Sequence, residues 1–203
     1  SIPLAEQLRP KNWDEFVGQE HLVGADGIIR KLLSSKSLPS LILWGSPGTG
    51  KTTIAGLIAK DLQVPFFKLN AIDAGVKDIR NIIQKAQPYK TVILFLDEIH
   101  RFSKSQQDSL LHAVEKGIIT LIGATTENPS FEIIPPLLSR CQVYVLNPLE
   151  ISDLDKLLQR AIDFYSSKNI IIEVIEKEAL FTYSGGDARK LYNVIELLVD
   201  SSN

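Results

Sequence analysis

The chain has 203 residues, enough for one substantial core or for one domain with a small appendage. Its 44% hydrophobic and 23% charged residues are typical of a soluble globular protein. The apolar runs are only strand-length, which excludes a membrane-spanning helix, and the single cysteine, Cys141, excludes an internal disulfide and indicates a reducing cytosolic setting. The net charge of −2 shows no basic excess, so charge alone leaves DNA binding open.

Short apolar runs alternate with helical patterns along residues 1–148, which predicts a parallel α/β sheet with helices on both faces. The predicted strands are Leu41–Trp44, Val64–Leu69, Thr91–Leu96, Ile118–Ile122 and Val143–Leu146. The predicted helices are Asp26–Ser35, Thr52–Leu62, Val76–Ala86 and Lys104–Lys116. Ser103 is the expected N-cap of the last of these helices and Gly117 its C-cap.

After Pro148 the pattern becomes mainly helical. Ser152 and Asp155 resemble a capping box, and the apolar face of the helix that follows is Ile151, Leu154, Leu157, Leu158, Ala161, Ile162 and Tyr165. Further helices are predicted over Ile175–Tyr183 and from Asp187 to about Val199. We therefore predict an α/β domain over residues 1–148 and a small helical domain over residues 149–203, expected to be incomplete at Asn203.

A phosphate-binding loop is the strongest functional signal. Gly45-Ser46-Pro47-Gly48-Thr49-Gly50-Lys51-Thr52 has the full G-x-x-x-x-G-K-[ST] pattern between a predicted strand and a predicted helix. Glycines let backbone N–H groups approach phosphate oxygens, Lys51 would lie against the β- and γ-phosphates, and the Thr52 hydroxyl would bind Mg²⁺. The plainer alternative is a Gly-rich strand–helix turn. The predicted nucleotide-binding residues here are Gly45, Ser46, Pro47, Gly48, Thr49, Gly50, Lys51, Thr52 and Thr53.

Two acids, Asp97 and Glu98, directly follow a predicted strand. Ligands of an open α/β sheet gather at the carboxyl ends of its strands. Asp97 is therefore predicted to hold Mg²⁺, and Glu98 to orient and deprotonate an attacking water. The alternative is a pair of solvated acids at the start of a loop.

Three further positions depend on context. The strand Ile118–Thr126 runs into polar residues that would touch a γ-phosphate, although Asn128-Pro129 is also an ordinary turn signal. Arg140 and Arg189 suit charge on a transferring phosphoryl group, but without further context a surface arginine paired with a carboxylate is the favoured interpretation of each. His21, His100 and His112 show no metal spacing with Cys141, Trp13 and Trp44 suit packing, and Lys77, Lys85 and Lys90 suit a solvated face or a nucleic-acid path.

These motifs, in this order, resemble those of the clamp-loader-like AAA+ ATPases across essentially the whole chain. Three stretches resemble more narrowly the replication-associated recombination protein A group, which includes MgsA and the Werner-helicase-interacting protein. They are Pro3–Pro10 with Val17-Gly18-Gln19, then Asp97–Asp108, and Gly123–Phe131. The run His-Arg-Phe-x-Lys-Ser-Gln-Gln in the second stretch is specific to that group.

The resemblance implies roles for individual residues. Thr126 matches the sensor-1 position, with Thr125 beside it as a less certain match. Arg140 matches an arginine finger that acts on ATP in an adjacent subunit, and Arg189 matches sensor 2 on the helical lid. The segment that packs around adenine corresponds to Arg9, Pro10, Val17 and Gly18.

The resemblance also implies a five-stranded P-loop fold in which the Walker-B strand, which carries Asp97, is not adjacent in sequence to the P-loop strand. One departure is Ser46, which stands where proline is usual in the group, although its backbone N–H can still serve. The group's C-terminal oligomerisation region is expected to be missing, so this chain is expected to assemble and hydrolyse ATP poorly.

The predicted function is a Mg-dependent, DNA-associated ATPase that maintains replication forks, as a homo-oligomer with DNA and replication or repair proteins as partners. It is expected in the bacterial cytosol and nucleoid, or in the nucleus of a eukaryote, and at no membrane. The alternatives are a clamp-loader-like scaffold or switch with little hydrolysis, a branch-migration subunit, and a P-loop small-molecule kinase. Glu98 argues against the switch and the kinase, because neither needs a second acid to activate water.

Overall fold

The computed structural model describes residues 1–202, and the chain separates into two compact units. The sheet unit comprises Glu20–Gly45 and Lys51–Leu146. The helical unit comprises Ser1–Gln19, Ser46–Gly50 and the described residues from Asn147 onward. The helical unit thus contains the predicted helical domain together with two segments that the sequence assigns to the α/β domain, and the boundary between residues 148 and 149 stays a prediction.

Five parallel strands form the sheet unit, in the order β2-β3-β4-β1-β5. They are β1 Ser40–Trp44, β2 Phe66–Asn70, β3 Val92–Asp97, β4 Ile119–Thr125 and β5 Cys141–Val145. The predicted five-stranded parallel α/β fold is confirmed. The interior strands β1, β3 and β4 are almost wholly buried, as their continuous apolar sequences require when helices cover both faces.

Strand ends differ from the prediction by a few residues. β2 begins at Phe66 and not at Val64, because the Val64 N–H bonds the Ala59 carbonyl at 3.4 Å and so closes the preceding helix. β4 runs three residues past Ile122, because Ala124 and Thr125 keep pairing with β1. These differences arise from hydrogen bonds to other segments, which apolar runs do not report.

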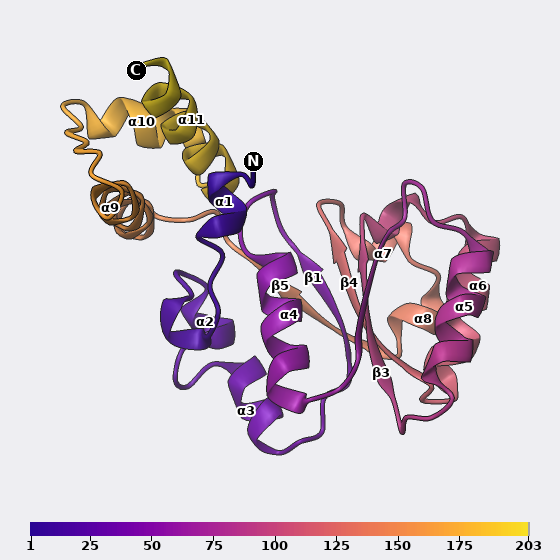
Figure 1. The fold of residues 1–203 in the computed structure, drawn as a ribbon. Coiled ribbons are helices and arrows are strands. Elements are labelled where there is room, and N and C mark those ends of the chain that lie inside the picture. Colours follow the sequence, from indigo (N-terminus) through magenta and orange to yellow (C-terminus); the bar gives the residue numbers. More distant parts are fainter. Residues whose placement is uncertain (203) are drawn as a thin grey trace. The chain divides into compact units, whose positions relative to one another are not determined.

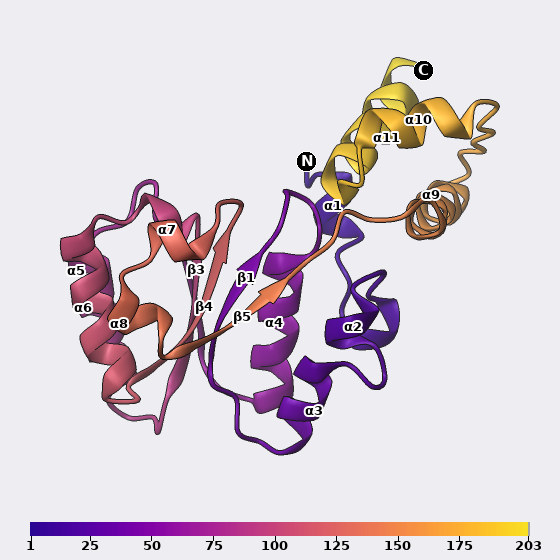
Figure 2. The same ribbon diagram turned by 180° about the vertical axis from the view of Figure 1, so that it is seen from behind.

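Helices flank both faces of this sheet (Figures 1 and 2). α4 Lys51–Leu62 covers one face, on the side of α2 Glu20–Val23 and α3 Ile28–Ser34, while α5 Val76–Ala86, α6 Lys104–Glu115 and α8 Pro135–Leu138 lie on the other. The remaining short elements of the unit are η2 Ile99–Arg101 and α7 Pro129–Glu132. Ser103 caps α6 as predicted, accepting the Gln106 N–H at 3.2 Å, and Gly117 follows the helix with φ 72°.

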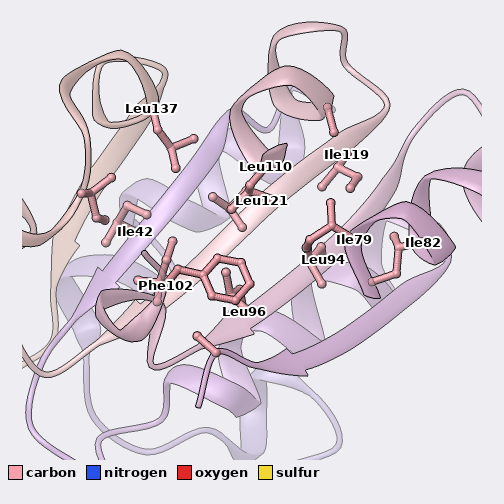
Figure 3. Close-up of a cluster of buried hydrophobic side chains, with 14 of the residues drawn as sticks. Ile42, Ile79, Ile82, Leu94, Leu96, Phe102, Leu110, Ile119, Leu121 and Leu137 are labelled. Carbon is pink, nitrogen blue, oxygen red and sulfur yellow. The ribbon is translucent and has the colours of Figure 1, made fainter. Parts of the chain in front are cut away.

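A cluster of buried side chains lies between the sheet and α5, α6 and α8 (Figure 3). Leu94 and Leu96 from β3 and Leu121 from β4 contact this cluster, and none has measurable exposure. Phe102, directly after η2, is buried in the same cluster, so η2 is held by a side chain that points into the core. The core thereby positions the segment that follows the two acids.

The helical unit is built from α1 Leu4–Gln7, α9 Ile151–Ser166, α10 Lys177–Ser184 and α11 Ala188–Ser201, with the short η1 Trp13–Glu15. Its core joins Leu4 to the apolar faces of α9 and α11, and the Leu4 N–H bonds the Glu196 carboxylate at 3.2 Å. None of the helices within residues 1–202 has the length and apolar character needed to cross a membrane.

Three helix starts were predicted incorrectly, and the first is α3, which begins at Ile28, two residues later than predicted. α9 begins at Ile151, with Glu150 as N-cap and the Asp153 carboxylate accepting the Glu150 N–H at 3.0 Å, so Ser152 and Asp155 do not form the capping box. The predicted apolar face is otherwise buried, except that Ile151 is exposed and Ile162 half-buried. α10 begins at Lys177, two residues later than predicted.

Gln107 is a buried polar residue that holds the segment after β4 in place. Its side-chain amide donates to the Phe102 carbonyl at 3.1 Å and the Glu132 carbonyl at 2.9 Å, and its oxygen accepts the Ile134 N–H at 2.8 Å. Gln107 is the last residue of the run His-Arg-Phe-x-Lys-Ser-Gln-Gln. Its hydrogen bonds therefore give part of that run a structural role.

Gln107→Leu is expected to lower the free energy of unfolding by about 2 kcal/mol, because it removes one buried and two part-buried hydrogen bonds to backbone groups. Urea denaturation followed by circular dichroism measures the change. Ser105→Ala, at an exposed position of the same helix, is the control and should stay within about 0.5 kcal/mol of the parent. Equal stability of Gln107→Leu and the control would contradict this role.

Candidate functional site

The carboxyl ends of β1, β3 and β4 bring the predicted functional residues of the sheet unit to one edge. Trp44, the last residue of β1, pairs with Thr125, the last residue of β4. In turn Leu96 of β3 pairs with Gly123 of β4. Parallel strands in this register end side by side, so the residues after all three strands share one edge.

The two ends of the phosphate-loop motif are anchored to that edge. Gly45 is buried, and its N–H bonds the Thr125 carbonyl at 3.1 Å. Lys51 is the first residue of α4, and its Nζ donates to the Gly45 carbonyl at 2.7 Å. Thr52 and Thr53 follow in the first turn, both half-buried. A helix start beside a lysine is a favourable environment for an anion.

The middle of the motif, Ser46–Gly50, packs within the helical unit. The Gly48 carbonyl accepts the Ala188 N–H at 2.9 Å at the start of α11, and Gly48 has φ 73°. Gly50 has φ 112° and lies against the Phe16 ring, where an added Cβ would come within 2.5 Å. Thr49 is buried and donates to the Ser46 carbonyl at 2.8 Å. Ser46 and Pro47 are exposed.

The buried Gln19 side chain holds this loop in the helical unit. Its amide donates to the Thr49 carbonyl at 3.2 Å and to the Asn147 carbonyl at 2.7 Å, while its oxygen accepts the Asn147 N–H at 2.9 Å. A single side chain therefore ties the N-terminal segment to the loop and to the start of the C-terminal segment.

The two acids have different local environments. The Asp97 carboxylate accepts the Glu98 N–H at 2.9 Å, and both side chains are half-buried. Glu98 has left-handed backbone angles, φ 54° and ψ 40°, which are uncommon for a residue with a Cβ. Its Oε2 lies 3.2 Å from His100 Nε2. The turn into η2 thus directs the Glu98 carboxylate toward the His100 ring.

Thr125 and Thr126 differ in burial. Thr125 is buried, and its hydroxyl lies 2.9 Å from His100 Nδ1 and accepts the Glu127 N–H at 2.9 Å. Thr126 is half-buried in the position directly after β4. The sensor-1 assignment to Thr126 stays a prediction, while Thr125 has an evident structural role.

Arg140 lies at the opposite edge of the sheet. It directly precedes β5, whose first residue Cys141 pairs with Ser40 at the start of β1. Its guanidinium donates to Glu115 Oε2 at 2.8 Å and to the Pro136 carbonyl at 2.8 Å. Because both charged side chains are about 40% exposed, the pair contributes no more than about 1 kcal/mol. The guanidinium is therefore available for exchange with another anion.

The remaining predicted residues belong to the helical unit. Arg189 is the exposed second residue of α11, whose N-cap Asp187 accepts the Lys190 N–H at 3.1 Å. Arg9 pairs with Glu6 at 2.8 Å. Pro10, Val17 and Gly18 are half-buried, and Gly18 has φ 85°. Their assignments to sensor 2 and to the adenine segment stay predictions.

The residues available for a metal ion are oxygen donors. The Thr52 hydroxyl and the Asp97 carboxylate are the hard ligands that Mg²⁺ prefers, so the donor set fits the ion. Within the described chain no three or more His, Cys, Asp or Glu side chains gather as a metal cluster. Cys141 is unsuited to bind a metal or to act as a nucleophile, because burial raises its pKa to about 12.

Sequence reasoning missed three residues of this region. The sequence shows only that His100 lacks metal spacing with Cys141, yet its ring lies between Glu98 and Thr125. Phe16 and Gln19 pack against the phosphate loop within the helical unit. Gln19 and His100 each lie in one of the three stretches that resemble the recombination protein group. That resemblance was the signal available in the sequence for both residues.

Comparison with known proteins agrees with this geometry. Residues 41–149, more than half of the chain, match the family model "ATPase family associated with various cellular activities (AAA)". The chain belongs to the AAA family of ATPases. The AAA match spans the sheet and both acidic residues, and so includes the loop, the Walker-B strand and the segment before β5.

Relatives within the AAA family agree with the narrower resemblance. Over 98% of this chain, the replication-associated recombination protein A of Coxiella burnetii is 45% identical and the ATPase WRNIP1 of Dictyostelium discoideum is 44% identical. The chain spans 47% and 24% of those two proteins. The predicted resemblance to this group is confirmed.

A solved AAA structure shares the fold. The structure described as the Thermotoga maritima RuvB Holliday junction branch migration motor matches with a TM-score of 0.75 and 30% identity, over 95% of this chain and 65% of that one. The sheet topology described above is therefore an AAA arrangement with a helical C-terminal part.

Gly48→Ala is expected to lower the free energy of unfolding by about 1–3 kcal/mol, because it combines an unfavourable left-handed conformation with a steric clash. An added Cβ would come within 1.7 Å of the Asp187 carboxylate. Thermal and urea unfolding measure the effect.

Gly56→Ala is the matched control. Gly56 lies inside α4, and nothing approaches an added Cβ within 4 Å. Helix propensity should make this variant more stable than the parent by up to about 1 kcal/mol. If both alanine variants had the same stability, the packing of Gly48 against Asp187 would be wrong.

Proposed function

We propose that this chain binds Mg-ATP and hydrolyses it to ADP and phosphate. The observation that carries the proposal is the shared edge of the sheet, where Lys51 and Gly45 follow β1 while Asp97 and Glu98 follow β3. A lysine with a helix start binds phosphate, and a carboxylate beside it activates water. Membership of the AAA family supports the same reaction.

Each residue has a distinct part in the proposed reaction. Lys51 and the loop N–H groups bind the β- and γ-phosphate oxygens and spread their charge. Glu98 accepts a proton from water as the water oxygen attacks the γ-phosphorus. The bond between the γ-phosphorus and the β–γ bridging oxygen breaks in the same step. Thr52 and Asp97 would hold Mg²⁺, which neutralises charge on the phosphates when bound. The products are ADP and inorganic phosphate.

Arg140 is proposed to complete the site of an adjacent subunit. It precedes β5, whereas the phosphate loop follows the paired strand β1, so the two are separated by the length of a five-residue strand. That length is about 16 Å, which exceeds the reach of an arginine side chain. This separation supports action in trans, and assembly would then control the rate of hydrolysis.

The biological setting is proposed from relatives. Proteins that share 45% and 44% identity with this chain are named for replication-associated recombination and as the ATPase WRNIP1. We infer that the protein acts as a DNA-associated homo-oligomer in replication-fork maintenance, with DNA ends or single strands as effectors. Sensor 2 at Arg189 and the adenine-binding roles of Arg9, Pro10, Val17 and Gly18 belong to the same proposal.

A branch-migration motor is the second candidate, because the matched RuvB structure carries that description. The identity to RuvB is 30%, compared with 45% to the recombination protein. Unwinding of a synthetic four-way junction by the intact protein would favour this candidate. ATPase stimulation by ends or single strands, without junction movement, would favour the first.

Lys51→Ala is expected to bind Mg-ATP about 10- to 100-fold more weakly, because a charge-assisted contact to phosphate is lost. Glu98→Gln should bind Mg-ATP as tightly as the parent but release phosphate at least about 100-fold more slowly. Isothermal titration measures binding, and a phosphate-release assay with no added acceptor measures turnover.

The controls are Lys60→Ala, at an exposed residue of α4, and Glu132→Gln, at an exposed residue of α7. Both should match the parent. Tight binding by Lys51→Ala would refute the assigned nucleotide site, and unchanged turnover by Glu98→Gln would remove its role as base. Phosphate release that strictly requires a hydroxyl acceptor would indicate a kinase.

Arg140→Ala is expected to be nearly inactive alone, and so is Glu98→Gln, yet a mixture of the two should recover activity. In the mixture, ATP held by an Arg140→Ala subunit has its own Glu98 and meets Arg140 from its Glu98→Gln neighbour. The rate of phosphate release as a function of mixing ratio measures this recovery.

Glu115→Gln is the control, since it releases Arg140 from its ion pair without removing the guanidinium. It should retain activity alone. A mixture with no more activity than the sum of its parts, in a sample shown to be oligomeric, would contradict action in trans.

A further inference from the structure

A continuous path of polar contacts, three hydrogen bonds and one close imidazole–carboxylate contact, joins the phosphate loop to the proposed base inside the sheet unit. Lys51 Nζ donates to the Gly45 carbonyl at 2.7 Å, and the Gly45 N–H donates to the Thr125 carbonyl at 3.1 Å. The Thr125 hydroxyl lies 2.9 Å from His100 Nδ1. His100 Nε2 lies 3.2 Å from Glu98 Oε2. The path therefore runs from the loop lysine to the carboxylate through one strand end and one imidazole.

A bond from His100 to Glu98 would set the direction of both imidazole contacts. Glu98 as a carboxylate can only accept, so a neutral ring that donates to it carries its proton on Nε2. Nδ1 is then an acceptor, and the Thr125 hydroxyl donates to it. The Thr125 oxygen accepts the Glu127 N–H at 2.9 Å, and its hydroxyl also lies 3.3 Å from the Glu127 carbonyl, to which it can donate when Nδ1 carries the ring proton. The Nε2–H tautomer is therefore the state that a bond from His100 to Glu98 requires.

The backbone conformation of Glu98 makes this arrangement possible. Its left-handed angles begin η2, where the Arg101 N–H bonds the Glu98 carbonyl at 2.8 Å. This tight turn brings the side chains of residues 98 and 100 to the same side. The contact to His100 involves one oxygen of the carboxylate, Oε2. The other oxygen is then the one that would accept a proton from water.

We propose that His100 is a positioning residue for Glu98: it holds the carboxylate in one orientation and links that orientation, through Thr125, to the start of the phosphate loop. The proposal rests on the proposed hydrolysis of ATP. In this role His100 acts through the Glu98 carboxylate and not on the substrate or the attacking water. Its effect would therefore fall on turnover and leave nucleotide affinity unchanged.

Two amide substitutions separate the two bonds of the ring. His100→Gln places an amide donor near the position of Nε2 and so keeps the bond to Glu98. His100→Asn is shorter, places its amide near Nδ1 and loses that bond. His100→Asn should lower kcat by about 10- to 100-fold, as expected when a catalytic group is misplaced, while the Kd for Mg-ATP stays the same. His100→Gln should retain most of the parent kcat.

His112→Gln is the matched control, because His112 is an exposed histidine on α6. It should leave kcat and Kd unchanged. Similar kcat values for His100→Asn and His100→Gln, or a loss of affinity in place of turnover, would overturn the positioning role.

The imidazole tautomer provides a readout that needs no turnover. Long-range ¹H–¹⁵N spectra of the parent chain, recorded at about pH 8 where an ordinary imidazole is neutral, should show His100 as the Nε2–H tautomer. Glu98→Ala removes the acceptor and should shift the population toward Nδ1–H. An Nδ1–H tautomer in the parent, or no change in Glu98→Ala, would overturn the proposal.

The two readouts also distinguish this inference from the proposed function. A parent chain that bound Mg-ATP but released no phosphate would contradict the hydrolytic function. The tautomer experiment would still decide whether His100 holds Glu98. Conversely, normal hydrolysis with an Nδ1–H imidazole would retain the function and reject the role of His100.

Discussion

The parallel pairing of β4 with both β1 and β3 is the constraint on which the site depends. Strands that run in the same direction and in register must end at the same edge, so the segments that follow them converge. The Gly45 N–H extends this pairing one residue beyond β1 by bonding the Thr125 carbonyl. The first residue of the phosphate loop is thus positioned by the sheet itself.

The phosphate loop has different packing partners at its ends and in its middle. Gly45 and Lys51 belong to the sheet unit, whereas Ser46–Gly50 groups with the helical unit through the Gly48–Ala188 and Thr49–Gln19 hydrogen bonds. Glycine is required at Gly48 because the φ is positive and the Asp187 side chain leaves no space for a Cβ. The loop sequence therefore reflects packing within the helical unit as well as the phosphate contact that we propose.

The ion pair of Arg140 contributes little to stability. The Arg140–Glu115 pair is solvent-exposed and weak, and it lies at the edge of the sheet opposite the phosphate loop. The buried side chains of Gln19 and Gln107, by contrast, are uncharged amides that hydrogen-bond backbone groups. Such side chains hold loops in place without adding a charge that would compete for phosphate.

The sequence by itself determined the five strands, the main helices, the phosphate loop and the two acids, because periodicity and motif spacing are local properties of the chain. It also carried the family resemblance. Only the tertiary structure decided the partners of individual side chains, such as the Thr125 hydroxyl beside His100 and the Asn147 backbone beside Gln19. Those partners are 25 and 128 residues apart in sequence, and packing, which no local pattern encodes, brings them together.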